Sequence, residues 1–185
     1  MRLRVRASRT AVCIVAFLLF QVVGCSNHAS RPRESESVAD RFPTADGSML
    51  ALSEFTGKVV LLTFGATWCP MCAIEMRDLQ RVHRRLAPEG LQVVAVLIDE
   101  SIEDVASFVR ENGITYPVLK DRDGRLQGQF KISSLPVTVA LDARGQQIPL
   151  IDPETEQLVD QIDGPRSWDK AKEISLLRQL LLPAR

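Results

Sequence analysis

The sequence predicts an α/β domain in which helices flank a mixed central sheet, with an N-terminal hairpin extension before the first long strand. Residues 58–64 and 91–98 are continuous apolar runs rich in β-branched side chains, which is typical of strands buried on both faces. Each run precedes a segment whose apolar residues recur at helical spacing. Residues 136–142 and 146–151 flank a turn at Ala143-Arg144-Gly145, which indicates an antiparallel hairpin. Strands that alternate with helices before such a hairpin predict a mixed sheet covered on both faces.

The folded part is expected to begin near Arg41. Asp46-Gly47 is a turn signal between two short, partly apolar segments, and it predicts the N-terminal hairpin. After the strand at 58–64, apolar residues recur at helical spacing until Pro88-Glu89-Gly90 ends the pattern. The residues that define this helical face are Ile74, Leu79, Val82 and Leu86.

The second half of the domain begins with another helix. Ser101 followed by Asp104 resembles a capping box, with aspartate in place of the usual glutamate or glutamine. This helix is expected to end near Asn112-Gly113. Its apolar face consists of Val105, Phe108 and Val109. The remaining elements are expected to be a short segment ending at Phe130, the hairpin already described, a strand at 157–162 and a helix from about Ser167 to Leu182.

Residues 1–24 have the pattern of an export signal. The first nine residues hold four arginines, and residues 11–23 form an apolar run of 13 residues. Such a run is too short to span about 30 Å of hydrocarbon comfortably, and it suits the core of a signal peptide. The run ends at VVGCS, which resembles the bacterial lipobox, where the chain is cut before the cysteine and the thiol is lipidated. The alternative is an uncleaved or ordinarily cleaved signal that happens to carry a cysteine.

Three regions are therefore expected: a lipoprotein signal peptide over 1–24, a lipidated Cys25 with a flexible tether over 25–40, and a folded domain over 41–185. The tether is polar and charged and lacks an apolar period. A multiply acylated cysteine would supply the stable anchor that a single acyl chain does not. Ser26 does not match the aspartate that retains lipoproteins in a Gram-negative inner membrane. The sequence is therefore compatible with anchoring in the outer membrane as well as in the inner one.

Charge and composition are those of an ordinary globular protein, with 23 basic and 23 acidic residues. Loss of residues 1–24 would remove four arginines and no acid, which leaves 19 basic and 23 acidic residues and a net charge near −4. The chain has no basic stripe to follow a phosphate backbone, so nucleic acid is not expected as a partner.

The four cysteines fall in different regions of this expected organisation, and two of them form a pair. Cys13 would leave with the signal and Cys25 would be lipidated, which leaves Cys69 and Cys72 as the free pair. Export would place this pair in an oxidising compartment, where a disulfide can persist. Because their separation of three closes too small a loop to stabilise the fold, a chemical role is favoured.

The pair lies between a buried strand and a helix, where thiolate chemistry is favoured. Positions i and i+3 of a helix share a face, close enough for two sulfurs to bond. Cys69 is expected at the helix N-terminus, where unpaired N–H groups and the helix dipole favour a thiolate and lower a cysteine pKa from about 8.5. Pro70 suits the first helical position, because an N–H there has no intrahelical partner.

The sequence resembles the TlpA/ResA/DsbE group of membrane-tethered thiol-disulfide oxidoreductases over about residues 41–185. The resemblance rests on GKVVLLTFGATWCPMCAIEM, VVAVLIDE, YPVLKDRDG and FKISSLPVTVALDARGQ. It implies a thioredoxin-like fold, with Cys69 as the exposed nucleophile and Cys72 as the buried resolving thiol. Pro136 matches the group's cis-proline beside the disulfide, although a trans proline that starts a strand fits the sequence equally well.

The resemblance also assigns residues around the pair. Glu75 matches an acid that tunes the thiols and moves protons, and its place one turn after Cys72 would let it accept a proton. The alternative is a solvated glutamate that stabilises the early turns of the helix. Trp68 is expected to pack over the active-site turn and shield it. Ser134 and Leu135 are expected to line the substrate groove.

Two departures from the group leave the direction of electron flow open. The group often has an aromatic residue at the position of Gly65, and its proline commonly stands directly before the second cysteine. Here Pro70 follows the first cysteine and Met71 precedes the second. The residues between the cysteines influence the reduction potential, so the chain fits a reductant or an oxidant.

Three alternative functions fit the sequence less well. A peroxiredoxin-like peroxidase shares the fold, but it places a hydroxyl residue three before its reactive cysteine, where this chain has Ala66, with Thr67 one position late. A copper-binding metallochaperone lipoprotein needs a histidine beside its thiolates. His28 lies in the tether. His83 lies roughly 16 Å along the helix from Cys72, which is too far to bind the same ion. A scaffold lipoprotein that keeps the fold without catalysis is the third.

The favoured function is that of an extracytoplasmic thiol-disulfide oxidoreductase, a reductant by resemblance, in cytochrome c maturation or in general thiol reduction. Its expected partners are exported protein thiols and disulfides and a membrane electron donor, and the chain is expected to be a monomer without cofactor or metal. We expect it in the bacterial cell envelope, anchored through Cys25 and facing the periplasm or the exterior. The residues expected to act in catalysis are Cys69, Cys72, Glu75 and Pro136.

Overall fold

The computed structural model describes residues 41–99 and 101–182. The expected signal peptide, Cys25 and the tether lie outside the described residues. Of the helices in the described ranges, none combines the length and the apolar character that crossing a bilayer requires.

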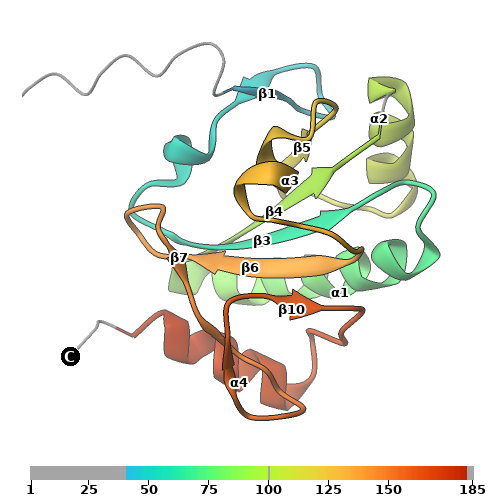
Figure 1. Ribbon diagram of the computed structural model, residues 1–185. Helices are drawn as coiled ribbons and strands as arrows, with labels where there is room; N and C mark the ends of the chain where they lie inside the picture. Colours follow the sequence, from blue (N-terminus) through green and yellow to red (C-terminus); the bar gives the residue numbers. More distant parts are fainter. Residues whose placement is uncertain (1–40, 100, 183–185) are drawn as a thin grey trace, which may run out of the picture. The chain divides into compact units, whose positions relative to one another are not determined.

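A six-stranded mixed sheet forms the centre of the domain, with the strand order β10-β6-β3-β4-β5 and β7 paired to β6. Its strands are β3 (Val59–Gly65), β4 (Leu91–Leu97), β5 (Val118–Lys120), β6 (Val137–Leu141), β7 (Gln147–Ile148) and β10 (Ile162–Asp163). β3, β4 and β5 run parallel, whereas β6 runs antiparallel to β3 (Figure 1). All seven residues of β4 and six of β3 are buried, which confirms the two expected strands with covered faces.

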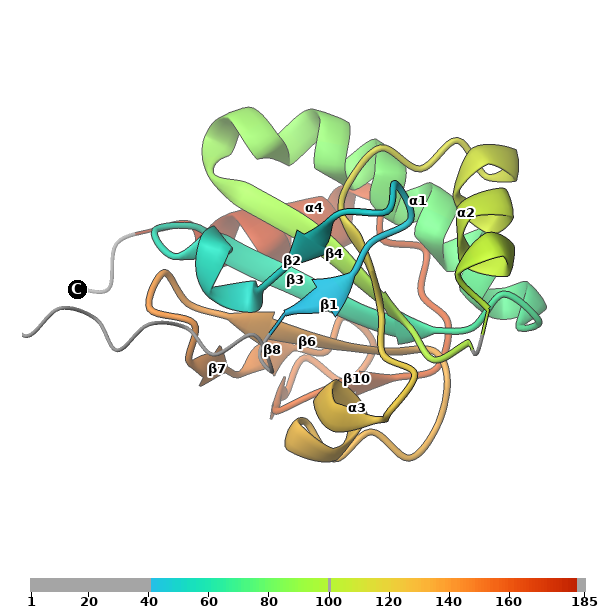
Figure 2. The same ribbon diagram turned by 90° about the horizontal axis from the view of Figure 1, so that it is seen from above.

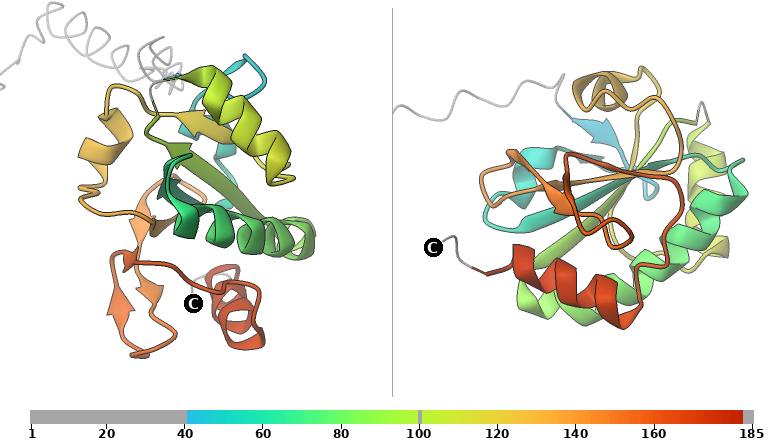
Figure 3. Two further views of the ribbon diagram at one scale, coloured as in Figure 1. Left: turned by 90° about the vertical axis from the view of Figure 1, so that its right-hand side faces the viewer. Right: turned by 60° about the horizontal axis from the view of Figure 1, so that its bottom comes forward.

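Three helices cover one face of this sheet, and the fourth helix and the N-terminal hairpin cover the other face. The helices are α1 (Pro70–Leu86), α2 (Ile102–Glu111), α3 (Arg125–Gln129) and α4 (Ala171–Leu180), with 3₁₀ turns at Leu52–Phe55 and Ala87–Glu89. α1, α2 and α4 share one apolar core with alternate side chains of β3 and β4, such as Leu61 and Val93. The other core joins Val60 and Val94 to α3 and the hairpin, so α3 lies opposite α1 and α2 (Figure 3). The mixed α/β architecture is therefore confirmed.

The expected N-terminal hairpin is present. β1 (Phe42–Pro43) pairs antiparallel with β2 (Met49–Leu50) around a turn that contains Asp46 and Gly47 (Figure 2). Gly47 has a φ of 85°, a left-handed conformation that glycine adopts without a steric penalty. A bridge between Thr44 and Leu119 attaches the hairpin to β5.

The segment between β7 and α4 differs from the expectation of one strand at 157–162. It holds β8 (Leu150–Ile151) and β9 (Leu158–Val159), which pair with each other, whereas β10 pairs with β6. Pro149 separates β7 from β8, and a proline cannot donate to a strand ladder, so the chain leaves the central sheet there.

Two helical expectations are also corrected. Ile74 is 46% exposed, because the buried face of α1 runs through Cys72, Met76 and Leu79 and Ile74 lies on the opposite side of the helix. The last helix begins at Ala171 and not near Ser167. The expected cap of α2 is present, since the amide of Asp104 donates to Ser101 Oγ, but the carboxylate that bonds Ser101 is that of Glu103.

Candidate active site

Cys69 and Cys72 form a disulfide at the start of α1, as the sequence predicts. Their sulfurs are 2.15 Å apart and their Cα atoms 5.3 Å apart. Cys69 is the N-cap of the helix, with Pro70 at the first helical position. Cys69 Sγ accepts a hydrogen bond from the backbone N–H of Cys72 at 3.2 Å. This amide is one of the unpaired donors of a helix N-terminus, and it points at the atom that carries negative charge in a thiolate.

The two sulfur-bearing residues are both largely covered. Cys72 is fully buried. Cys69 is only 9% exposed, so it is more buried than the exposed nucleophile that the resemblance implies. Ala66, Ile98 and Leu135 pack around the pair and account for this burial. Access to the disulfide is therefore restricted to the edge at which Cys69 meets a surface groove.

The groove beside Cys69 has a volume of about 490 Å³. It is lined by Trp68, Cys69, Pro70, Ile98, Gln127, Ser133, Ser134 and Leu135, which confirms the expected places of Ser134 and Leu135. The peptide bond between Leu135 and Pro136 is cis, so the conformation expected for Pro136 is confirmed and the trans alternative is wrong. Trp68 is 69% exposed and lines the groove beside Cys69, so its own side chain is less packed than expected.

The turn that carries the cysteines is fastened to the end of β4. The carboxylate of Asp99 accepts hydrogen bonds from the backbone N–H of Thr67, at 3.0 and 3.1 Å, and from its hydroxyl at 2.5 Å. The amide of Ile98 donates to the carbonyl of Gly65 at 3.1 Å. Asp99 was missed in the sequence, where the only signal is an acid directly after a buried strand.

Gly65 allows the backbone of β3 to approach the disulfide closely. A Cβ atom at Gly65 would lie 2.7 Å from Met76 Cε and 3.1 Å from Cys72 Cβ. The end of a methionine can move, but Cys72 is fixed by its disulfide, so a larger residue would press on the redox pair. The departure from the group's aromatic residue at this position thus fits the local packing.

Glu75 is buried in this protein, with 1% of its surface exposed, which excludes the alternative of a solvated glutamate. Its Oε1 accepts from Trp168 Nε1 at 2.9 Å and from Thr138 Oγ1 at 3.1 Å, and its Oε2 accepts from the backbone N–H of Arg166 at 3.2 Å. Burial raises the pKa of Glu75 above its ordinary value, and these hydrogen bonds oppose that rise. A carboxylate one turn from Cys72 is therefore held in a site where a proton is readily taken up.

The three donors around Glu75 were also missed in the sequence. Thr138 is a polar residue within an otherwise apolar strand, which is a weak signal of a buried partner. Trp168 and Arg166 come from the segment before α4, some 90 positions after Glu75, and nothing local to them indicates this contact.

No three His, Cys, Asp or Glu side chains gather as a potential metal-binding group across the described part of the chain. His83 is half-buried, and its ring meets that of Tyr116 edge-on with centroids 5.8 Å apart. Burial and the nearby Lys58 lower the pKa of His83.

Comparisons with known proteins agree with this site. A model of the AhpC/TSA family matches residues 38–147. The thiol-disulfide oxidoreductase ResA of Oceanobacillus iheyensis is 35% identical over 101 residues, which cover 55% of this chain and 53%, about half, of that relative. ResA of Bacillus subtilis is 28% identical over 143 residues, which cover 76% of this chain and 78% of that protein.

A solved structure gives the same result. The crystal structure of a putative thiol:disulfide interchange protein DsbE from Chlorobium tepidum is 26% identical, with a TM-score of 0.64 over 76% of this chain and 92% of that one. The thioredoxin-like fold and the resemblance to the ResA and DsbE group are confirmed. The chain belongs to the AhpC/TSA family and is similar, within it, to thioredoxin-like thiol-disulfide oxidoreductases.

Proposed function

We propose that the chain is a thiol-disulfide oxidoreductase that exchanges its Cys69–Cys72 dithiol with disulfides of exported proteins. The observation that carries the proposal is the disulfide at the N-terminus of α1, where the Cys72 amide points at Cys69 Sγ and a groove borders Cys69. The relatives named thiol-disulfide oxidoreductase support the same chemistry.

In the reducing direction, the thiolate of Cys69 attacks one sulfur of a substrate disulfide and expels the other as a thiolate. The product is a mixed disulfide between Cys69 and the substrate. Cys72 then loses its proton to the Glu75 carboxylate and attacks Cys69 Sγ, which forms the Cys69–Cys72 disulfide and releases the second substrate thiolate. The substrate gains two electrons, and a membrane electron donor must return two to the protein.

We place this reaction outside the cytoplasm, with the domain anchored through Cys25. The basic start, the short apolar run and the cysteine at its end support a lipoprotein signal over residues 1–24. By resemblance, the substrates are exported proteins whose thiols must be kept reduced, such as an apocytochrome. A reduction potential near that of thioredoxin, about −270 mV, would support a reductant, and one near about −120 mV would make the protein an oxidant.

The Thr67 hydroxyl bears on the peroxidase alternative. It donates to Asp99, so it is committed to the turn and not to a peroxide at Cys69.

Reduction of insulin disulfides by the purified full chain, with dithiothreitol as donor, tests the proposed activity. We expect catalysis by the wild type and background rates for Cys69→Ser. A Cys13→Ser variant, which alters a cysteine of the expected signal peptide, should keep full activity. An inactive wild type, or an active Cys69→Ser variant, would contradict the proposal, and peroxide consumption without insulin reduction would favour a peroxidase.

A further inference from the structure

The segment between β10 and α4 reaches back to the redox centre. It supplies two of the three hydrogen-bond donors to Glu75: the indole N–H of Trp168 at 2.9 Å and the backbone N–H of Arg166 at 3.2 Å. The third donor is the hydroxyl of Thr138, on β6. Both carboxylate oxygens therefore have a partner, and the orientation of the carboxylate is fixed from outside α1.

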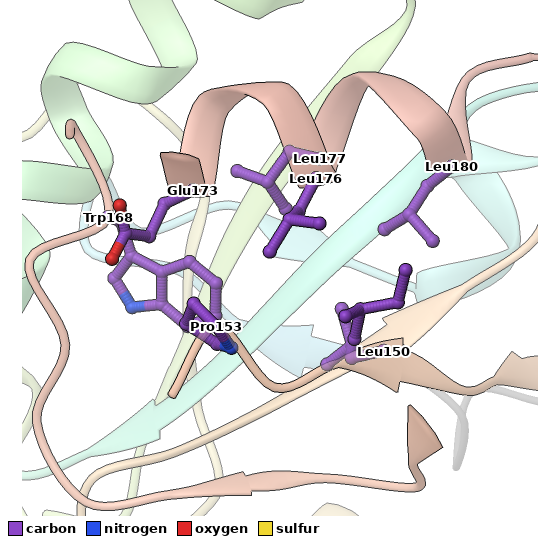
Figure 4. Close-up of a pocket in the computed structure, with 8 residues that line it drawn as sticks. Leu150, Pro153, Trp168, Glu173, Leu176, Leu177 and Leu180 are labelled. Carbon is purple, nitrogen blue, oxygen red and sulfur yellow. The ribbon is translucent and has the colours of Figure 1, made fainter. Parts of the chain in front are cut away.

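Trp168 is held rigidly enough to position another group. It is buried, and its indole lies beneath the start of α4, where Pro153 and Leu177 line the same cavity (Figure 4). This cavity has about 10 Å³ of free space, which is room for about one water molecule. Because its ring is enclosed by the β8–β9 hairpin and α4, the indole N–H stays aimed at Glu75.

The charged and phenolic groups near Glu75 are engaged with other partners, so the indole N–H is a main source of stabilisation for the Glu75 carboxylate. The guanidinium of Arg166 pairs with Asp152 at 3.2 Å and with Glu154, on the turn between β8 and β9, so much of its charge is engaged there. The phenol of Tyr116 donates to the carbonyl of Met76 at 3.0 Å. On α1 itself, the titratable residues one turn away are Cys72 and Asp78, and Asp78 pairs with Arg81.

We infer that Trp168 is a positioning residue for the redox reaction, which acts through Glu75 by holding its carboxylate in the ionised form one helical turn from Cys72. The inference rests on the proposed function, in which Glu75 accepts the proton of Cys72. In that step, the Cys72 S–H bond breaks, the proton joins a Glu75 oxygen, and the sulfur electron pair forms the bond to Cys69 Sγ.

The balance of effects on Glu75 supports this role. Burial raises the pKa of Glu75, and the Trp168 hydrogen bond is the foremost effect that lowers it. Without the indole N–H the pKa of Glu75 would rise further, so the carboxylate would be protonated, and unable to accept a proton, up to a higher pH.

The test is Trp168→Phe, which keeps an aromatic ring in the cavity but removes the N–H. The first readout is the titration of the Glu75 carboxyl carbon, followed by carbon-13 NMR in the oxidised full chain. We expect its midpoint to rise by about one pH unit, the size expected for loss of one hydrogen bond to a charged group. Leu177→Ala is the matched control, because it loosens the same packing without removing a donor, and it should leave the midpoint unchanged.

The second readout is the pH dependence of insulin reduction, whose acid limb should move upward by the same amount in Trp168→Phe. In a Glu75→Gln background the Trp168 substitution should have no such effect.

An unchanged Glu75 midpoint, or an equal shift in Leu177→Ala, would overturn the inference. If the wild type does not reduce insulin, the proposed function fails, while the NMR titration still decides whether Trp168 controls Glu75. Should Trp168→Phe not fold, benzothienylalanine at position 168 keeps the indole shape without the N–H.

Discussion

The disulfide and the buried carboxylate one helical turn after it are built in opposite ways. The disulfide and its helix cap come from four consecutive residues, Cys69 to Cys72, in one turn. The surroundings of Glu75 come from β6 and from the segment before α4, which lie 63 to 93 positions away along the chain. The comparison indicates that thiolate activation is a local property of the sequence, whereas control of the proton depends on the completed fold.

Glu75→Gln separates the two regions most sharply. It keeps the shape of the side chain and leaves the disulfide intact, but it removes the proton acceptor. We expect exchange to slow by about 100-fold, the lower end of the range for general acid–base catalysis, and the acid limb of the pH profile to vanish.

The control for this variant is Glu111→Gln, which alters an exposed glutamate of α2 and should retain wild-type rates. Equal rates for Glu75→Gln and Glu111→Gln in insulin reduction would show that the carboxylate takes no part in the chemistry.

Asp99→Asn tests how far the turn of the disulfide depends on a distant group. The substitution weakens the charge-assisted hydrogen bonds to Thr67. We expect the free energy of unfolding to fall by about 1–3 kcal/mol, measured by urea denaturation, with exchange slowed because the turn loses its fastening. Asp123→Asn, at an exposed position, should change stability by less than about 0.5 kcal/mol. A loss of unfolding free energy no larger than that of this control would show that Asp99 does not stabilise the turn.

These contrasts also explain what the sequence could predict. β3 and β4 were predicted because strands buried on both faces leave continuous apolar runs, and the cysteine pair because its spacing is set within one helical turn. Ile74 was misplaced because spacing alone does not identify which apolar residues of a helix face the sheet.

Contacts between distant segments were beyond prediction. The partners of Glu75 and Asp99 depend on how the strands are ordered, and their own neighbours in sequence carry no sign of the contact. The exposure of Trp68 likewise depends on which segments pack beside the active-site turn, here the loop before Pro136.

The burial of Glu75 predicts a pH dependence of stability. The pKa of Glu75 in the folded protein lies above its ordinary value of 4.5, because burial disfavours the charged form. The folded state therefore binds the proton more tightly, and this contribution to stability is full below about pH 4.5 and is lost as the pH rises through the folded-state value.

Glu75→Gln lacks this titration, so the stability of the wild type should fall relative to that of the variant as the pH rises from 4 to 7. Urea unfolding of both proteins across this range measures the difference. A difference that stays constant with pH would mean that the carboxyl has the same pKa in the folded and unfolded states.

Ile74→Ser gives the smallest expected effect. Ile74 is exposed on α1 between two residues of the redox site, so its loss should change the free energy of unfolding by less than about 0.5 kcal/mol. Leu79→Ala, on the buried face of the same helix, should cost about 2–5 kcal/mol. A similar cost at both positions, in urea denaturation, would contradict the assignment of the two faces.

Trapping of a mixed disulfide by Cys72→Ser tests the central claim most directly. The variant lacks the resolving thiol, so the pre-reduced protein, mixed with a disulfide-containing peptide, should accumulate one adduct that dithiothreitol reverses. Peptide mapping by mass spectrometry should place the adduct on Cys69. The absence of an adduct, or its placement on another cysteine, would contradict the account.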